Sequence, residues 1–296
     1  MRIVFIGAVE FSERALQRLL EVKTGAEIVG VCTLEEAPGN ADHRDLSGIA
    51  REAGVPWQYT PRINAAESVG WIREQKPEAI FCFGWSRLLG PELLRVPLRG
   101  VVGFHPAALP ANRGRHPLVW ALVRGLAETA STFFLMDEGA DTGPILHQEA
   151  VPISYSDDAR TLYDKVTATA LAQLEEWVPA WVEGRLEPWP QEPGAGNSWR
   201  KRGKADGAID WRMDARAIYD LVRGLARPYV GAHFLWKGKE IKVWRCEEVA
   251  AAVPENLEPG KVLDGGAGGP VIKAGRGAVR LRETQPTVEW TEGEYL

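Results

Sequence analysis

Segments typical of strands and of helices alternate over the N-terminal third of the chain, and this alternation constrains the fold more than any other feature. Compact apolar runs that predict buried strands are followed by stretches in which leucines and valines recur at helical spacing. The expected strands lie at 2–7, 27–33, 78–83 and 100–104, and the expected helices begin at Ser12 and near residue 64. This order predicts a mostly parallel, Rossmann-like α/β sheet with helices on both faces. Ligands of such sheets lie beyond the carboxyl ends of the strands.

The C-terminal part of the chain has a different pattern. A long helix is expected over 157–183, and a stretch with several prolines and glycines then interrupts the periodicity. A helix near 214–226 precedes short strand-like pieces separated by turns, which predicts a small, open, OB-like β-barrel. We therefore expect a main α/β domain at 1–186, a linker at 187–206 and a C-terminal barrel domain at 207–296.

Composition and charge limit the class of protein further. The chain has 40 acidic and 35 basic residues and a formal net charge of -5, which argues against a partner held mainly through phosphate contacts. No GxGxxG follows the first strand, so a classical NAD enzyme is not expected. Cys32, Cys82 and Cys246 lie too far apart for a zinc site and are typical of small core residues. The N-terminal apolar run is too short for a signal peptide or a membrane span, so we expect a cytoplasmic protein without a membrane partner.

Two stretches carry polar residues where a strand is expected to end. Residues 103–120 leave a strand at His105, and residues 133–145 present Asp141 on a loop with two glycines. A histidine and an aspartate placed in this way fit three interpretations. They form an acid/base pair, or they bind a metal with His116 as a third ligand, or they make a structural hydrogen bond. A serine hydrolase is less favoured, because no GxSxG elbow is present.

The same two stretches resemble the signature of the folate-dependent formyltransferases. Residues 105–110 (HPAALP) are similar to the family's His-x-Ser/Ala-Leu-Leu-Pro segment, Arg113-Gly114 to its Arg-Gly pair, and Asp141-Thr142-Gly143 to its Asp-Thr-Gly loop. The likeness extends to the first strand and to residues 209–234, which resemble the start of the family's C-terminal domain. It therefore covers nearly the whole chain. This superfamily includes methionyl-tRNA formyltransferases and, more similar to this chain, the formyltransferases of nucleotide-linked amino sugars.

The resemblance implies a chemical role for each site residue. His105 would polarise the formyl carbonyl and stabilise the oxyanion of the intermediate, an effect typically worth ~3 kcal/mol. Asp141 would hold His105 or an ordered water and help to collect the proton that leaves the amine. The formyl donor would be 10-formyltetrahydrofolate, without a metal, and its pteridine would lie in an apolar slot. The expected lining of that slot is Phe83, Gly84, Trp85, Leu88, Leu89, Met136, Asp137, Gly139 and Ala140.

The chain departs from the family pattern at one position. The family usually carries asparagine two residues before the histidine, as a second oxyanion donor, and this chain has Gly103 there. Either another group replaces it, with Asn112, Ser86 and His116 as candidates, or the chain is a weak or altered catalyst. Of these candidates we include Asn112 with His105 and Asp141 among the expected catalytic residues.

Charge also predicts the accepting amine. The methionyl-tRNA enzymes typically carry a basic loop after the second strand, whereas residues 34–48 (LEEAPGNADHRDLSG) are short and acidic. We therefore expect a nucleotide-linked amino sugar, contacted by Arg113, Arg115 and His116, rather than tRNA. The arginines also fit surface ion pairs. A formyl-folate hydrolase and a non-catalytic folate-binding protein are the alternatives, and the 12 tryptophans leave room for an apolar homodimer surface.

Overall fold

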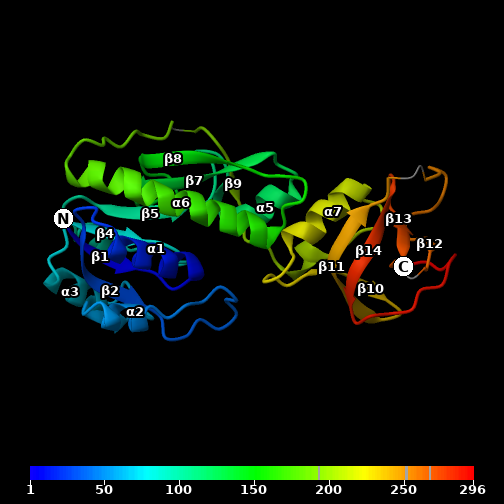
Figure 1. The fold of residues 1–296 in the computed structure, drawn as a ribbon, viewed down its shortest axis with the longest axis horizontal. Helices are drawn as coiled ribbons and strands as arrows, with labels where there is room; N and C mark the ends of the chain where they lie inside the picture. The colour runs from blue at the N-terminus through cyan, green and yellow to red at the C-terminus, as the bar shows by residue number, and fades with distance from the viewer. Residues whose placement is uncertain (193, 251–252, 267) are drawn as a thin grey trace. The chain divides into compact units, whose positions relative to one another are not determined.

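The computed structural model describes residues 1–192, 194–250, 253–266 and 268–296, which divide into two compact units (Figure 1). Unit 1 comprises Met1–Gly114, Ala130–Val151 and Lys165–Trp199. Unit 2 comprises Arg115–Thr129, Pro152–Asp164 and Arg200–Leu296. The domain limits expected from the sequence stay a prediction.

A seven-stranded sheet in the order β3-β2-β1-β4-β5-β7-β8 forms the centre of unit 1. The strands are β1 (Arg2–Ile6), β2 (Glu27–Thr33), β3 (Trp57–Tyr59), β4 (Ala79–Cys82), β5 (Val101–His105), β7 (Glu128–Leu135) and β8 (Ile145–Pro152). Strands β1 to β5 pair in parallel and β7 pairs antiparallel with β5, which confirms the mostly parallel sheet. The strand order changes direction at β1 and β4, and the ligand crevice of such a sheet lies at the carboxyl ends of these strands.

Helices pack on both faces of this sheet, because consecutive side chains of β1, β2 and β4, which point to opposite faces, are buried. On β4, Phe81 contacts Trp177 of the long helix with a centroid distance of 5.5 Å, while its neighbour Ile80 belongs to the core cluster that contains Ile72 and Leu93. The helices are α1 (Glu10–Glu21), α2 (Ser47–Glu52), α3 (Ala66–Glu74), α4 (Pro91–Leu94) and α6 (Ala159–Val182). Among the described residues, none of the helices is long and apolar enough to cross a membrane.

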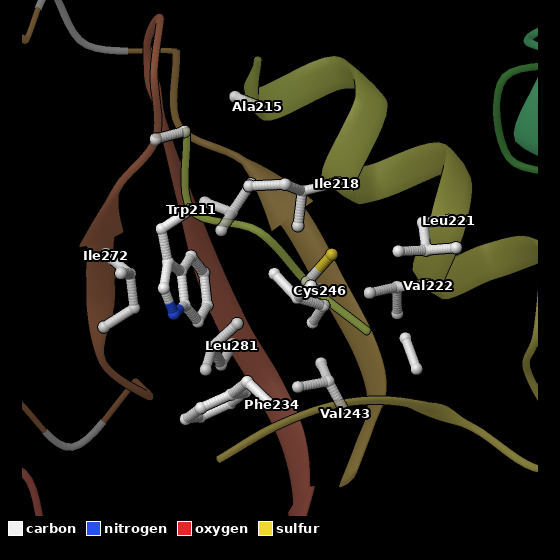
Figure 2. Packing of buried hydrophobic residues seen from close by; sticks show 14 of the residues in the cluster. Trp211, Ala215, Ile218, Leu221, Val222, Phe234, Val243, Cys246, Ile272 and Leu281 are labelled. Atoms are coloured by element: carbon white, nitrogen blue, oxygen red, sulfur yellow. The ribbon is translucent and has the colours of Figure 1, made fainter. Parts of the chain in front are cut away.

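Unit 2 contains a five-stranded antiparallel sheet in the order β10-β11-β14-β13-β12, consistent with the expected small barrel. Its elements are α5 (Pro117–Val123), the 3₁₀ turn η1 (Lys204–Gly207), α7 (Ala215–Gly224), β10 (Ala232–Trp236), β11 (Lys239–Glu248), β12 (Val262–Asp264), β13 (Val271–Lys273) and β14 (Ala278–Gln285). Helix α7 buries Ile218, Leu221 and Val222, three residues at helical spacing, against the sheet. Figure 2 shows these side chains facing Val243 and Cys246 of β11.

Candidate active site

His105 lies at the carboxyl end of β5, the strand next to β4, on the edge of the sheet where a ligand is expected. His105 is the last residue of the strand and only 4% exposed. Its Nε2 atom lies 2.8 Å from the main-chain oxygen of Asn112. Because a carbonyl oxygen can only accept a hydrogen bond, Nε2 carries a proton and donates it there. When the ring is neutral, the lone pair of Nδ1 therefore remains for another partner.

Asp141 faces this second ring nitrogen. Its Oδ2 atom lies 3.6 Å from Nδ1 of His105, which is longer than a direct hydrogen bond. The same oxygen accepts the main-chain N–H of Gly114 at 2.9 Å. The carboxylate is thus fixed by a donor that does not involve the histidine. His105 and Asp141, the two residues singled out in the sequence, are thus brought together, with Nδ1 and Oδ2 facing each other across a short gap.

Both loops of the site are held in left-handed backbone conformations. Asp141 has a φ of 58° and Asn112 a φ of 65°. Asp137 stabilises the first loop, because its Oδ1 atom accepts the N–H of Gly139 at 2.9 Å and the hydroxyl of Thr142 at 2.7 Å. The main-chain oxygen of Asn112 is the acceptor that fixes His105, so Asn112 contributes to the site through its backbone.

The space beside Gly103, where the side chain of a second oxyanion donor would lie, is occupied by Phe134 of β7 and by Met136. Gly103 pairs with Phe134 of β7. A Cβ atom on Gly103 would lie 2.9 Å from Cγ of Met136 and 3.0 Å from two ring atoms of Phe134, closer than ordinary packing allows. A side chain at this position would therefore require Met136 and Phe134 to move.

The residues expected to hold the pteridine divide into buried and accessible ones. Phe83 is fully buried, and its carbonyl oxygen accepts the hydroxyl of Ser12 at 2.6 Å. Gly84, with a φ of 66°, has no room for a side chain because a Cβ atom would overlap Val9. Leu89 is also buried. These three shape the wall by packing and by main chain.

Trp85, Leu88 and the loop from Met136 to Ala140 are the more accessible of the residues expected to line the slot. Leu88 is 65% exposed, Trp85 and Met136 both pack against one core cluster, and Met136 also packs against the cluster that contains Leu109. Among the described residues, Nε1 of Trp85 is one of four buried side-chain polar atoms without a hydrogen-bond partner.

The expected substrate contacts fall into two kinds. The guanidinium of Arg113 is bound within unit 1, because it donates to Oε1 of Gln191 at 3.1 and 2.6 Å and to the carbonyl of Ala195 at 3.4 Å. Arg115 and His116 belong to unit 2. Partial burial, followed by the positive charges of Arg115, Lys201 and Arg202, lowers the pKa of His116. Positive charges therefore act on this histidine.

Three polar residues that support the site were missed in the sequence. Gln191 donates to the main chain of the Asp141 loop. Gln148 of β8 donates to the carbonyl of Leu109, and Thr132 of β7 donates to the carbonyl of Ala107 at 2.7 Å. Only the strand periodicity could have placed Thr132 and Gln148 on the face toward the loop after His105. Among the described residues, no group of three histidine, cysteine or acidic side chains could hold a metal ion.

Family models match both parts of the chain. The model described as "Formyl transferase" matches residues 1–177, and that described as "Formyl transferase, C-terminal domain" matches residues 201–291. The chain therefore belongs to the formyltransferase family, whose members are enzymes of folate-dependent formyl transfer. This assignment confirms the resemblance seen in the sequence.

Individual relatives differ in what their names say they act on. The chain is 30% identical over 307 residues to a methionyl-tRNA formyltransferase of Geobacter sulfurreducens, covering 100% of this chain and 95% of the relative. Its fold is similar to that of an N-formyltransferase from Helicobacter canadensis solved with folinic acid and dTDP-3-aminofucose. That TM-score is 0.73 at 15% identity, over 95% of this chain and 98% of the other. It is also similar to HypX from Aquifex aeolicus, with a TM-score of 0.65 at 20% identity over 94% of this chain, although the chain spans only 43% of HypX.

Proposed function

We propose that this protein moves a formyl group from 10-formyltetrahydrofolate to the primary amine of a nucleotide-linked amino sugar. The observation that carries the choice of acceptor is the segment between β2 and α2. It has four carboxylates, and its arginine, Arg44, is paired with Glu10 and Glu13 of α1 at 3.5 Å. A segment of this charge repels a polyphosphate chain, which supports a small acceptor over tRNA.

The geometry supports His105 and Asp141 as the groups that receive the proton of the amine. The donor supplies an electrophilic formyl carbon, and the amine must attack as a neutral base. The lone pair of Nδ1 and the carboxylate of Asp141 face the same gap, so a proton released there is accepted by either atom. Asp141 then stabilises the charged imidazolium.

The hydrogen bond to Asn112 sets a condition on the second role of His105. Nε2–H is committed to the carbonyl of Asn112, so the neutral ring has no other N–H to donate. Once the ring is charged, Nδ1–H becomes a donor for the negative charge that develops on the formyl oxygen. We therefore propose that His105 acts first as a proton acceptor and then as an electrostatic stabiliser. When the tetrahedral intermediate collapses, the bond between the formyl carbon and N10 breaks, and N10 of tetrahydrofolate leaves with the proton that His105 or Asp141 received from the amine.

We propose Arg115 and His116 as contacts for the phosphates of the acceptor. The cations that lower the pKa of His116 make this part of unit 2 attractive to a diphosphate.

The three cysteines are free thiols, which supports a reducing compartment such as the cytoplasm.

Methionyl-tRNA is the second candidate acceptor, because the chain is about 30% identical over 96–100% of its length to enzymes of that name.

Mass spectrometry of a panel of acceptors tests the proposal. The protein is incubated with 10-formyltetrahydrofolate and amino-sugar nucleotides, with methionyl-tRNA in parallel, and the gain of one formyl group is recorded. We expect one sugar nucleotide to be formylated, and His105→Ala and Asp141→Asn to lower the rate ~10²- to 10⁴-fold. The matched control is His147→Ala, since His147 also lies beside a carboxylate, 3.8 Å from Glu176.

Each other outcome has a defined meaning. Formylation of the tRNA alone keeps the chemistry and overturns the acceptor. Release of formate without transfer favours the hydrolase, and binding of folate without turnover favours the non-catalytic protein. An equal loss of activity in His147→Ala contradicts the assignment of His105.

A further inference from the structure

The side chain of Gln191 joins the loop of Asp141 to Arg113. Gln191 is 9% exposed. Its Nε2 atom donates to the carbonyl oxygens of Asp141 at 2.9 Å and of Gly143 at 2.8 Å. Its Oε1 atom accepts from Nε and Nη2 of Arg113 at 3.1 and 2.6 Å. All four bonds lie within unit 1.

These partners leave the amide of Gln191 with a single orientation. The two carbonyl oxygens can only accept, and the guanidinium of Arg113 can only donate. Rotation of the amide by 180° would therefore replace four attractive contacts by four repulsive ones. Arg113 thus fixes the direction of the amide, and the amide fixes the main chain on both sides of Thr142.

The segment around Gln191 contacts the chain after Asp141 and also the loop that follows His105. Trp189 exchanges two main-chain hydrogen bonds with Ile145, at 2.8 and 2.9 Å. Further along, Oδ1 of Asn197 accepts the N–H of Asn112 at 2.9 Å. Strand β9 (Ser198–Trp199) then pairs in parallel with β6 (Arg113–Gly114). We name residues 189–192 and 194–199 the linker brace.

We infer that the linker brace positions the catalytic pair, with Gln191 as the positioning residue of Asp141. At one end it holds the main chain of the Asp141 loop, and at the other it holds Asn112, whose carbonyl fixes the ring of His105. The brace also adjoins Gly114, whose N–H binds Oδ2 of Asp141. The brace thus helps to set the 3.6 Å gap between Nδ1 and Oδ2.

The inference assigns Arg113 to the same assembly. Its three donors are directed at the brace, so we place it among the positioning residues rather than among the contacts to the acceptor. The inference rests on the proposed chemistry of His105 and Asp141. A displacement of about 1 Å at a reacting group can lower a rate by ~10²-fold, so loss of Gln191 affects the chemical step more than binding.

Substitutions of Gln191 test the assignment by two independent measurements. Gln191→Glu has nearly the same shape but loses both donors, and Gln191→Ala removes the side chain. We expect either change to lower kcat ~10- to 100-fold, with KM for both substrates within about twofold. Arg113→Lys loses the paired donation to Oε1 of Gln191. We expect its kcat to lie between that of these variants and that of the unchanged protein.

The second measurement does not depend on catalysis. Nitrogen-15 resonances of the His105 ring report its neighbours in the protein without donor or acceptor. We expect Gln191→Ala and Gln191→Glu to move these resonances in the direction produced by Asp141→Asn. If no acceptor is formylated by the unchanged protein, the proposed function fails, while the ring resonances still decide the positioning role.

Gln173→Ala is the matched control. Gln173 of α6 is fully buried and is bonded to Ser131 and His147, so its loss lowers stability without touching the brace. We expect unchanged His105 resonances in this variant and kcat within about twofold while the protein stays folded. The inference is overturned if Gln191→Glu keeps both kcat and the ring resonances, or if Gln173→Ala shifts them equally.

Discussion

The ring of His105 is held between two acceptors of different kinds. The carbonyl of Asn112 accepts a hydrogen bond from Nε2–H, while the carboxylate of Asp141 faces Nδ1 across 3.6 Å. The first contact decides the tautomer and the second leaves space for a proton to arrive. Sequence reasoning placed these residues near each other because both follow strands. It could not decide which nitrogen is available, since that depends on a main-chain oxygen seven residues further along.

Gly103 offers a test of packing at the residue scale. We expect Gly103→Asn to lower the free energy of unfolding by about 1–3 kcal/mol without raising formyl transfer, because Phe134 and Met136 already fill the space. Thermal unfolding and the transfer assay measure the two effects. Gly70→Ala is the control, since nothing lies within 4 Å of a Cβ atom at Gly70. Greater activity in Gly103→Asn would show that the site can accept the missing donor.

At the scale of elements, the sequence predicted regular segments well and the brace poorly. Strand β5 and helix α6 follow from apolar periodicity, which is a local property. From the sequence, the residues of the linker brace are interpreted as part of a linker because prolines and glycines interrupt the periodicity. Its structure comes from bonds such as Gln191 to Asp141, 50 residues apart, and Gln191 to Arg113, 78 residues apart. No local pattern encodes such pairs.

Helix α7 depends on a buried ion pair that gives a second prediction. Asp220 and Arg223 are joined at 2.7 Å with side chains that are each 5% exposed. Arg223 also donates to the carbonyl oxygens of Ser154, Tyr155 and Asp157 at 3.1, 3.4 and 2.9 Å. We expect Arg223→Leu to lower the free energy of unfolding by about 3 kcal/mol, because it leaves a buried carboxylate and three carbonyls with fewer donors.

Urea titration of Arg223→Leu measures this loss. The control is Arg212→Ala, which removes an exposed arginine paired with Asp210 and should leave the unfolding midpoint unchanged. A loss in Arg223→Leu no larger than that in Arg212→Ala would contradict the importance of the buried pair. Retention of formyl transfer in folded Arg223→Leu is also expected, since neither residue of the pair belongs to the proposed catalytic set.

On the scale of the whole molecule, buried thiols in both units link stability to pH. Burial raises the pKa of Cys32 and of Cys246 from the ordinary 9.0 to about 12, and burial also raises that of Cys82. Below pH 9 the thiols are protonated in both states and contribute nothing to the pH dependence. Between pH 9 and 12 the unfolded chain loses these protons while the folded chain keeps them. Stability therefore falls as the pH rises through this window.

We expect the free energy of unfolding to fall by roughly 1 kcal/mol per buried thiol between pH 9 and 10, since each pKa unit of difference corresponds to ~1.4 kcal/mol. Urea unfolding at pH 8, 9 and 10 measures the slope. Cys246→Ala lowers stability at every pH but removes one thiol. Its free energy of unfolding should therefore fall by roughly 1 kcal/mol less between pH 9 and 10 than that of the unchanged protein. Other groups that titrate in this range affect both proteins equally and cancel in the comparison. Equal slopes would mean that the Cys246 thiol ionises in the folded protein, against the burial of its side chain in the core of unit 2.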